Sequence, residues 1–456
     1  MNQDFDEQGE AFDEEAISIE VNGAEIEVDQ VLDAATDAVR PIAYAPGTAK
    51  GAPAANPPRF PAFSHRNFRL FWTGNILSLI GTLAQEAARG WLVRSLTPDP
   101  FLLTLVAACG TFPILLLTLY AGAIADRVHK ARGLIVTNAV SMALAFLLWG
   151  LTAAGHIQIW GVAAIALGVG VVNSFDITMR QSMNVEMVGH DDLPNAIALN
   201  STAFNGARVL GPAIGGALIA GLGIAGCFLA NAFSFVPLIW ALGKMKLPPV
   251  ERQKRRAGLA EIAEGFDWIR VHPILAPTTL LIAVCSFAAF SFGNLLPIFA
   301  KDVFRTNASG FTLMLTSSGV GALFAAGLLA ATGEMRHKGR RLLGGALAFC
   351  GCVVGFALSP SLALACAFLA VSGFCLLTCL MTANTLVQVA APNNLSGRVF
   401  SFYSLALVGV APLGALWIGA LAKWFGPREA VAMSAGLAMA WTLGTILKCR
   451  AVWREP

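Results

Sequence analysis

Apolar residues fill long stretches of this chain without a single charged side chain. These stretches are Leu102–Ala125, Gly133–Gly155, Val209–Gly243, Pro273–Ala300, Thr306–Gly333, Leu342–Gly397 and Val399–Ala422. A hydrocarbon core of about 30 Å takes about 20 helical residues, and only a helix or a closed barrel satisfies every backbone group in lipid. Because the stretches do not alternate between apolar and polar residues as barrel strands do, they predict membrane-spanning helices.

The two longest stretches must fold into helical hairpins. The first breaks near Gly221-Leu222-Gly223 and the second near Ser359-Pro360-Ser361, which gives twelve helices. The expected ranges are 67–93, 102–125, 133–154, 157–178, 193–220, 224–245, 275–300, 310–332, 342–358, 362–388, 397–425 and 430–447. The predicted fold class is therefore an all-α membrane protein with twelve transmembrane helices.

Composition agrees with this prediction. Hydrophobic residues make up 56% of the chain and charged residues 13%, and 45 glycines suit the close approach of membrane helices. The nine cysteines lie within apolar segments and read as small apolar residues rather than disulfide partners or metal ligands. We find no P-loop, catalytic acid pair or metal motif, so we expect no cofactor, no metal and no enzyme activity.

Positive charges gather in alternate loops, as the positive-inside rule describes for cytoplasmic loops. These are Arg127, Lys130 and Arg132; Arg252, Lys254, Arg255 and Arg256; Arg336, Lys338, Arg340 and Arg341; and Lys448, Arg450 and Arg454. The rule predicts that these loops and both termini face the cytoplasm. The cluster after residue 251 is expected to bind anionic lipid and not nucleic acid.

The first 60 residues differ from the rest, since they hold thirteen acidic and three basic residues. Residues 17–28 alternate around Asn22-Gly23 like a small hairpin. We expect residues 1–60 to be an acidic, disordered cytoplasmic tail and linker, with a docking or regulatory segment as the alternative. Residues 61–245 and 275–456 then form two six-helix halves, joined by a cytoplasmic linker at 246–274 with an amphipathic helix.

A repeat supports the two halves. His190-Asp191-Asp192-Leu193-Pro194-Asn195 resembles Pro392-Asn393-Asn394-Leu395-Ser396-Gly397, about 200 residues later. The helices that follow align as well, with Gly211-Pro212 beside Ala411-Pro412. Parallel halves of this kind rock about a site near the middle of the membrane.

At this point the chain resembles the major facilitator superfamily over about residues 61–448. The residues from Gly122 to Arg132 are similar to its motif A, with His129 where a glycine usually stands. Gly211-Pro212-x-x-Gly215-Gly216 is similar to motif C, which in that superfamily accompanies export by proton antiport. The segment Asp191–Ser201 and Gly90-Trp91-Leu92-Val93 look like the enterobactin-exporter-like branch, which neighbours macrolide efflux proteins.

The resemblance implies a gate at the cytoplasmic face. Asp126 lies among basic residues of the motif A loop and faces the N-terminus of a neighbouring helix, which the resemblance gives as the helix starting near Gly397. The gate residues are Gly122, Asp126, Arg127, Lys130 and Arg132. The alternative is a basic loop that only fixes topology.

Motif C has a physical reading of its own. Gly211 and Pro212 interrupt a helix, and Gly215 and Gly216 remove side chains so that another helix can approach. The sharper hypothesis is that tight packing there prevents leak and favours antiport. The plain alternative is a kinked packing helix.

Ionisable residues within membrane helices are functional candidates because they cost free energy unless paired or hydrated. Glu86, with Arg89 as counter-ion, is the first candidate for the proton or substrate-cation site, against a structural ion pair. Asp176 is expected to join the inner gate with Arg180 or with the motif A arginines, against a role in carrying protons. Arg208 would attract an anionic or catecholate substrate, against simple pairing with Asp176.

Uncharged residues offer further candidates for a substrate cavity. The polar ones are Asn75, Gln85, Asn173, Asn200, Asn205, Asn294, Asn384 and Gln388, and the aromatic ones are Trp72, Trp91, Phe287, Phe290 and Phe292. For the aromatic residues, packing or contact with lipid is the plainer reading.

The sequence thus predicts a multi-pass secondary exporter of the inner membrane. It would move a small organic molecule outward in exchange for protons, as a monomer in the lipid bilayer. The branch resemblance favours a siderophore, with multidrug or macrolide efflux as the alternative and a lipid-moving role also compatible. From another class, a non-transporting sensor or scaffold using the acidic tail stays open.

Overall fold

The computed structural model describes residues 18–21, 24–27, 60–125, 128–189, 191–245, 267–332, 337–391 and 396–449. Residues 1–58 form a unit separate from the rest. In it, β1 (Ser18–Val21) and β2 (Ala24–Glu27) pair antiparallel, with Val21 opposite Ala24. This pairing confirms the predicted hairpin. The other residues of the expected acidic tail lie outside the described residues.

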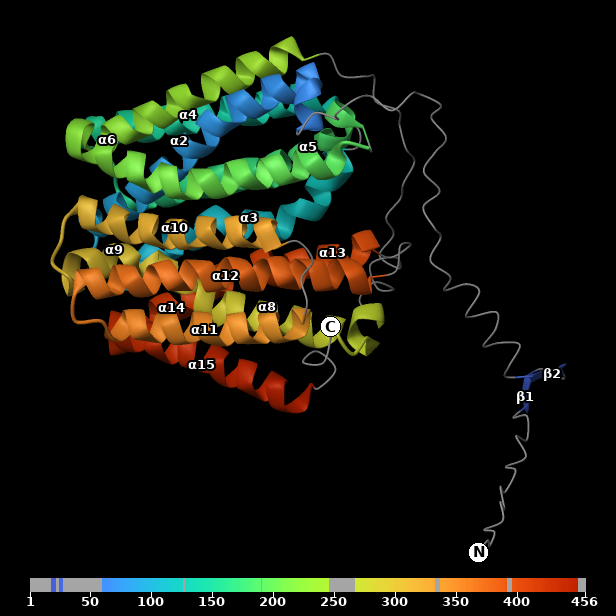
Figure 1. The fold of residues 1–456 in the computed structure, drawn as a ribbon. Coiled ribbons are helices and arrows are strands. Elements are labelled where there is room, and N and C mark those ends of the chain that lie inside the picture. The colour runs from blue at the N-terminus through green and yellow to red at the C-terminus, as the bar shows by residue number, and fades with distance from the viewer. Residues whose placement is uncertain are drawn as a thin grey trace, which may run out of the picture. The chain divides into compact units, whose positions relative to one another are not determined.

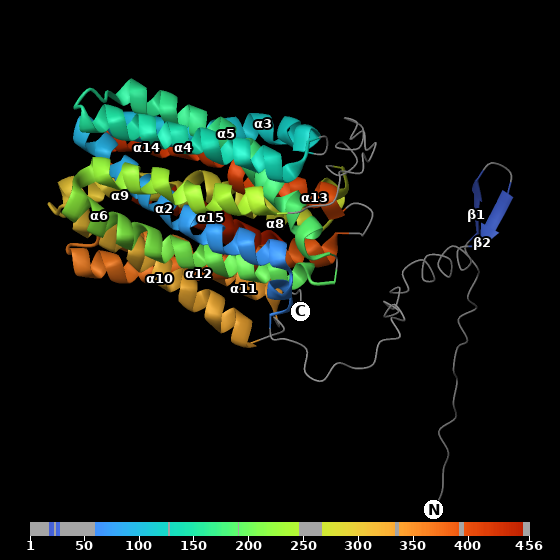
Figure 2. The same cartoon turned by 90° about the horizontal axis from the view of Figure 1, so that it is seen from above.

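The second unit, residues 59–456, is helical wherever it has described secondary structure. After a 3-10 turn at Pro61–Ser64, its first helices are α2 (Arg66–Leu96), α3 (Pro100–Ala125), α4 (Lys130–Ala153), α5 (Ile159–Val188) and α6 (Leu193–Lys244). Then follow α8 (Leu275–Val284), α9 (Leu296–Ile298), α10 (Ala308–Thr332), α11 (Lys338–Leu358), α12 (Leu362–Ala390), α13 (Ser396–Ser404), α14 (Ala411–Phe425) and α15 (Pro427–Lys448). Figure 1 shows the helices lying side by side, and in Figure 2 α3, α4 and α5 lie opposite α10, α11 and α12.

Both predicted hairpin breaks are present. α6 changes direction at Gly223, whose φ of 73° lies in the left-handed region that glycine adopts without strain. α11 ends at Leu358, and the Ser361 side chain caps α12 by accepting a hydrogen bond from the N–H of Leu364. These breaks turn two long apolar stretches into helical pairs.

α5 runs ten residues beyond its predicted end at Thr178. In the structure, Met179, Met183 and Met187 recur at helical spacing on the buried face and pack in one cluster with Phe68 and Leu134. Burial of this methionine stripe extends the helix.

Ten helices within the described ranges are long and apolar enough to cross a membrane. This number differs from the predicted twelve for two reasons. α6, with 52 residues, counts once although it bends at Gly223, and α2, with 31 residues, is not among the ten. Polar residues such as Asn75, Gln85 and Glu86 lower the hydropathy of α2. The chain is a multi-pass membrane protein.

Glycines allow the helices to approach closely. Both arms of α6 pack on α2: a Cβ built on Gly215 would lie 3.1 Å from the Cα of Ala84, and one built on Gly74 would lie 2.9 Å from the Cα of Leu238. A Cβ on Gly321 of α10 would overlap the carbonyl oxygen of Ala370 on α12. Such contacts replace the hydrophobic effect, which does not drive association between helices in lipid.

Close contacts of the same kind join residues 66–244 to residues 275–448 along two seams. On one seam, Gly216 of α6 meets Thr312 of α10, and Gly319 of α10 meets the backbone of Arg208. On the other seam, Gly419 of α14 meets Thr104 of α3. These close contacts join the two sets of helices along both seams.

The α10–α12 contact gives a stability prediction. Gly321→Ala should lower the unfolding free energy by about 1–3 kcal/mol, because the new methyl group has no room beside Ala370. Gly327→Ala is the matched control on the same helix, since a Cβ there meets nothing within 4 Å and alanine favours the helix. Thermal unfolding in detergent measures both, and equal midpoints for the two variants would contradict the prediction.

Candidate functional site

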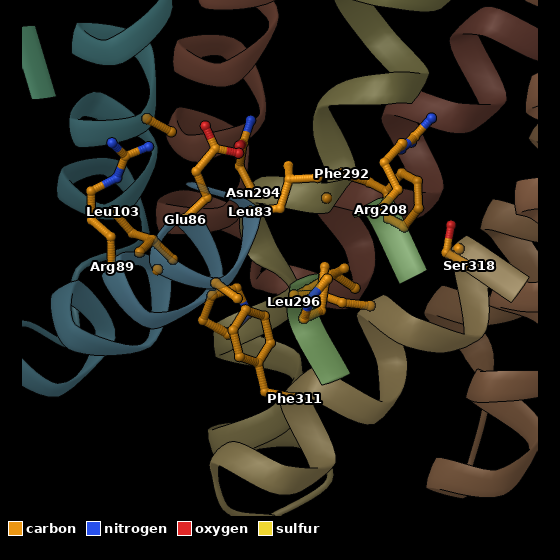
Figure 3. A pocket seen from close by; sticks show the side chains of 18 of the residues that line it. Leu83, Glu86, Arg89, Leu103, Arg208, Phe292, Asn294, Leu296, Phe311 and Ser318 are labelled. Carbon is orange, nitrogen blue, oxygen red and sulfur yellow. The ribbon is translucent and has the colours of Figure 1, made fainter. Parts of the chain in front are cut away.

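A cavity of about 330 Å³ lies where the two sets of helices meet. Its walls come from α2, α3, α6, α10 and α12 and from the segment between α8 and α9. Figure 3 shows Leu103, Phe292, Leu296 and Phe311 among its apolar lining. The volume is at the lower end of the range of about 300–1,000 Å³ that is typical of small-molecule sites.

Three ionisable side chains line the cavity: Glu86 and Arg89 from α2 and Arg208 from α6. They give it a formal charge of one positive unit when Glu86 is ionised. Within the described ranges, none of the three makes a side-chain hydrogen bond or an ion pair. A charge that no protein group neutralises needs water or a ligand.

The expected Glu86–Arg89 ion pair is not formed. Glu86 is exposed, whereas the Arg89 guanidinium lies beside α3, 3.7 Å from the place where a Cβ on Gly110 would sit. In Figure 3 the two side chains diverge, and Glu86 lies between Arg89 and Arg208 in the view. The i, i+3 spacing puts both residues on one helix face but does not fix where their ends point.

The helix beside the cavity is irregular. Between α8 and α9 the chain makes a π-helical turn at Cys285–Ala289 and a 3-10 segment at Phe290–Leu295, which supplies Phe290, Phe292 and Asn294 to the lining. The Ser291 hydroxyl donates to the Ser286 and Phe287 carbonyls, at 3.1 and 3.3 Å. Such interruptions of a membrane helix occur where the backbone borders protein or a cavity.

Most of the other polar and aromatic candidates are engaged elsewhere. Gln85 accepts a hydrogen bond from Asn231 at 3.0 Å, Trp72 donates to the Leu199 carbonyl at 3.2 Å, and Phe287 packs on Trp417. Trp91 stacks on Phe311, a lining residue, with ring centroids 5.9 Å apart. Of the polar candidates, Asn294 lines the cavity.

Asp176 and Arg180 form an ion pair inside a polar network that joins three helices. Asp176 accepts hydrogen bonds from Thr137 at 2.9 Å and Asn138 at 3.0 Å on α4, and Arg180 donates to Asn138 and to Asn75 on α2. Because every charge here has partners, the network ties α2, α4 and α5 together. The alternative pairing of Asp176 with Arg208 is not formed.

The motif A-like loop is described in part. Lys130 pairs with Glu186 of α5, Arg132 is exposed, and a Cβ on Gly122 would lie 3.9 Å from the Thr178 side chain. Asp126 and Arg127 lie outside the described residues. The loop before α6 holds the chain ahead of α2: Asp192 pairs with His65 at 2.7 Å, and Asn195 accepts a hydrogen bond from the N–H of Ala62 at 3.1 Å.

The motif C-like residues lie between the two sets of helices. Gly211 and Gly215 face Leu83 and Ala84 of α2, Gly216 faces α10, and Pro212 lines the cavity. This segment therefore touches both the helix that carries Glu86 and a helix of the other set. A side chain at any of these glycines would push α2 or α10 away.

Two ion pairs between the sets were not found by sequence reasoning. Arg94 at the end of α2 binds Asp302 with Nε and a terminal nitrogen, and Lys423 of α14 lies 2.8 Å from Asp99 in the α2–α3 loop. Burial would raise the pKa of Asp99, but the bonds from Lys423 and the Phe101 N–H lower it further, so the net pKa is below the ordinary 3.8. Partners more than 200 residues apart give no local signal.

Comparison with known proteins shows the family to which this chain belongs. The model of the family described as "Transmembrane secretion effector" matches residues 58–454. The chain belongs to this family of the major facilitator superfamily. Its members are secondary transporters and not enzymes, which confirms the resemblance inferred from the sequence.

Two relatives of this chain have names that state a transport function. The multidrug efflux pump Tap of Mycolicibacterium fortuitum is 27% identical over 369 residues, covering 76% of this chain and 88% of that protein. The staphyloferrin A transporter of Staphylococcus aureus (strain NCTC 8325 / PS 47) is 26% identical over 265 residues, covering 56% of this chain and 65% of that protein.

Solved structures support the fold. A POT family transporter in complex with 5-aminolevulinic acid superposes with a TM-score of 0.68 at 12% identity, covering 85% of this chain and 97% of that one. A bacterial homologue of the human lysosomal transporter Spinster, inward-facing and occupied, gives a TM-score of 0.64 at 13% identity, covering 88% and 100%. At these identities the likeness concerns the fold alone.

The Asp176 network gives a second prediction. Asp176→Asn should destabilise the protein, because it leaves the Arg180 guanidinium without a counter-ion among packed helices. The double variant Asp176→Asn/Arg180→Gln should recover part of the loss, with a coupling energy of about 1–3 kcal/mol. Thermal unfolding of the wild type, both single variants and the double variant measures it. Additive losses would show that the pair contributes nothing.

Proposed function

We propose that this transmembrane secretion effector exports a small organic molecule from the cytoplasm in exchange for protons. The observation that carries the proposal is the cavity between the two sets of helices, which holds one carboxylate and two guanidiniums that have no partner among the residues the structure describes. A proton-coupled carrier needs a carboxylate whose protonation changes with access. Glu86, which is exposed in that cavity, is the proposed coupling carboxylate.

The proposed topology is twelve transmembrane helices in two six-helix halves, in the inner membrane as a monomer, with both termini cytoplasmic. The bend of α6 at Gly223 and the length of α2 support counting two spans more than the ten apolar helices. The basic loops support the orientation. A non-transporting sensor or scaffold would not need a charged cavity between its halves.

The proposed substrate is a siderophore, and the alternative is a drug. The named function of the staphyloferrin A transporter supports the first, and that of the efflux pump Tap supports the second. The aromatic side chains Phe290, Phe292 and Phe311 in the cavity suit an organic ligand with a flat ring system of either kind.

Alternating access would use the seams and the ion pairs between the halves. Arg94–Asp302 and Lys423–Asp99 hold the outer end together, and each is partly exposed. Exposed pairs contribute about 0.2–1 kcal/mol, so they bias an equilibrium without preventing opening. At the inner end, the motif A residues and the Asp176–Arg180 pair would form the opposing gate. The motif C glycines would prevent leak by close packing.

Transport is tested with inside-out vesicles that carry a proton gradient. A labelled catecholate siderophore and a macrolide are offered to the wild type, Glu86→Gln and the control Glu429→Gln, whose side chain does not line the cavity. Wild type and the control should take up one compound until the gradient collapses, and Glu86→Gln should lose that uptake. Equal uptake by Glu86→Gln would remove Glu86 from the coupling step, and no uptake of either compound would count against both substrate classes.

The outer ion pairs give a further prediction. Asp99→Asn and Asp302→Asn should each speed amide exchange in residues 94–99 and 299–304 by up to about fivefold, because about 1 kcal/mol holding the ends together is lost. Hydrogen–deuterium exchange with mass spectrometry measures this, with Glu186→Gln as the control at the opposite end. Unchanged exchange at the outer end in both variants would exclude the gate.

The increase in amide exchange caused by Asp99→Asn should not depend on pH between about pH 5.5 and 8. The pKa of Asp99 lies below 3.8, so the stabilisation from its contact is complete above that value and is lost only as the pH falls through the lowered pKa. The ratio of exchange rates between Asp99→Asn and wild type should therefore stay constant over this range. A ratio that falls towards one near pH 5.5 would contradict the assignment.

A further inference from the structure

The charges that line the cavity constrain the substrate more than the shape of the cavity does. Among the lining residues, the titratable groups that face Glu86 are Arg89 on its own helix and Arg208 on α6, while α3, α10, α12 and the α8–α9 segment contribute none. The two guanidiniums attract an anionic group, and the single carboxylate attracts a cationic one. The cavity thus presents both signs of charge at separate places.

If substrate and protons cross the membrane in opposite directions, this exchange indicates which charge the substrate carries beside Glu86. Binding of an anion near Glu86 favours the protonated carboxyl, so an anion and a proton would occupy the cavity together and travel in the same direction. Binding of a cation on Glu86 excludes the proton, so the two would travel in opposite directions. Export by proton antiport through Glu86 is therefore favoured by a positive group on the substrate.

A purely cationic substrate would bring no negative group to pair with the guanidiniums of Arg89 and Arg208. Arg89 lies beside Gly110 on α3, whereas Arg208 lies at the seam with α10 and away from Glu86 in the view of Figure 3. A negative group on the substrate at Arg208 would neutralise that charge and span the two halves. A positive group at Glu86 and a negative group at Arg208 then match the charges on that side of the cavity, while Arg89 lies beside α3.

We propose that the cavity binds a zwitterion, with a protonated amine at Glu86 and a carboxylate or similar anion at Arg208, separated by an aromatic or apolar body. This inference rests on the proposed exporter function and names its substrate class. A siderophore or a drug that carries both groups should bind more tightly than one that carries a single charged group. The apolar body would lie against Phe292 and Phe311.

The test uses one scaffold in three charge states. Ciprofloxacin is an aromatic zwitterion, its methyl ester keeps only the amine, and N-acetylciprofloxacin keeps only the carboxylate. Binding to the purified full chain in detergent is followed by the fluorescence of the ligand. Wild type should bind the zwitterion at least about tenfold more tightly than either analogue, because each analogue leaves one charge of the cavity unpaired.

Variants assign each charge to a residue. Glu86→Gln should weaken binding of the zwitterion and the ester about tenfold and leave the N-acetyl analogue unchanged or tighter. Arg208→Gln should weaken the zwitterion and the N-acetyl analogue and leave the ester unchanged. Retained binding of one analogue in each variant shows that the variant is folded. Glu429→Gln and Arg69→Gln, matched residues outside the cavity, should bind all three ligands as wild type does.

Four outcomes would overturn the proposal: equal affinity of wild type for all three ligands, binding of none of them, the same loss for all three ligands in Glu86→Gln, or unchanged binding in both cavity variants. The vesicle experiment is independent of this result. Gradient-driven uptake of a siderophore or macrolide together with any of these four outcomes would sustain the exporter function and reject the zwitterion.

Discussion

In a bilayer, every polar group that leaves water must find its partner within the protein, and this constraint organises the whole molecule. It makes each span helical, so that backbone groups satisfy one another. It also separates the charged side chains into two kinds. Asp176 and Arg180 are enclosed by Thr137, Asn138 and Asn75, and they tie helices together. Glu86, Arg89 and Arg208 have no such partners in the described ranges and border the cavity.

The same solvent removes the hydrophobic effect as the force between helices, so close packing takes its place. Glycines serve this purpose within each set of helices, as where Gly321 of α10 packs against α12, and also between the sets, as at Gly216 and Gly419. Contacts within a set lock backbone against backbone. Contacts along the seams are similar in kind. Among the residues described, ion pairs of modest strength supplement these contacts, and they do so at one end only. This difference suits a molecule whose halves move while each stays intact.

The cavity combines these features. The helix that carries Glu86 is held by the glycines of α6, and the same helix continues to Arg94, which pairs across the seam with Asp302. Across from it, the segment between α8 and α9 departs from α-helical geometry where it meets the cavity. α2 therefore both borders the cavity and takes part in the Arg94–Asp302 ion pair. Under the proposed function, this shared helix would couple the cavity to the outer end.

The sequence by itself determined the elements. Uncharged stretches gave the spans, Gly223 and Ser359-Pro360-Ser361 gave the hairpin breaks, and the Gly211–Gly216 and Gly122–Arg132 segments gave the family, because these signals depend on nearby residues and on the bilayer. The far end of α5 was missed because its methionine stripe becomes meaningful only beside Phe68 and Leu134. Local spacing also predicted the pair of Asp176 and Arg180, four residues apart on one helix, which the structure contains. Tertiary structure decided the other charge contacts. It separated Glu86 from Arg89 and joined Arg94 to Asp302, since the direction of a long side chain and its distant partner depend on packing that no local pattern encodes.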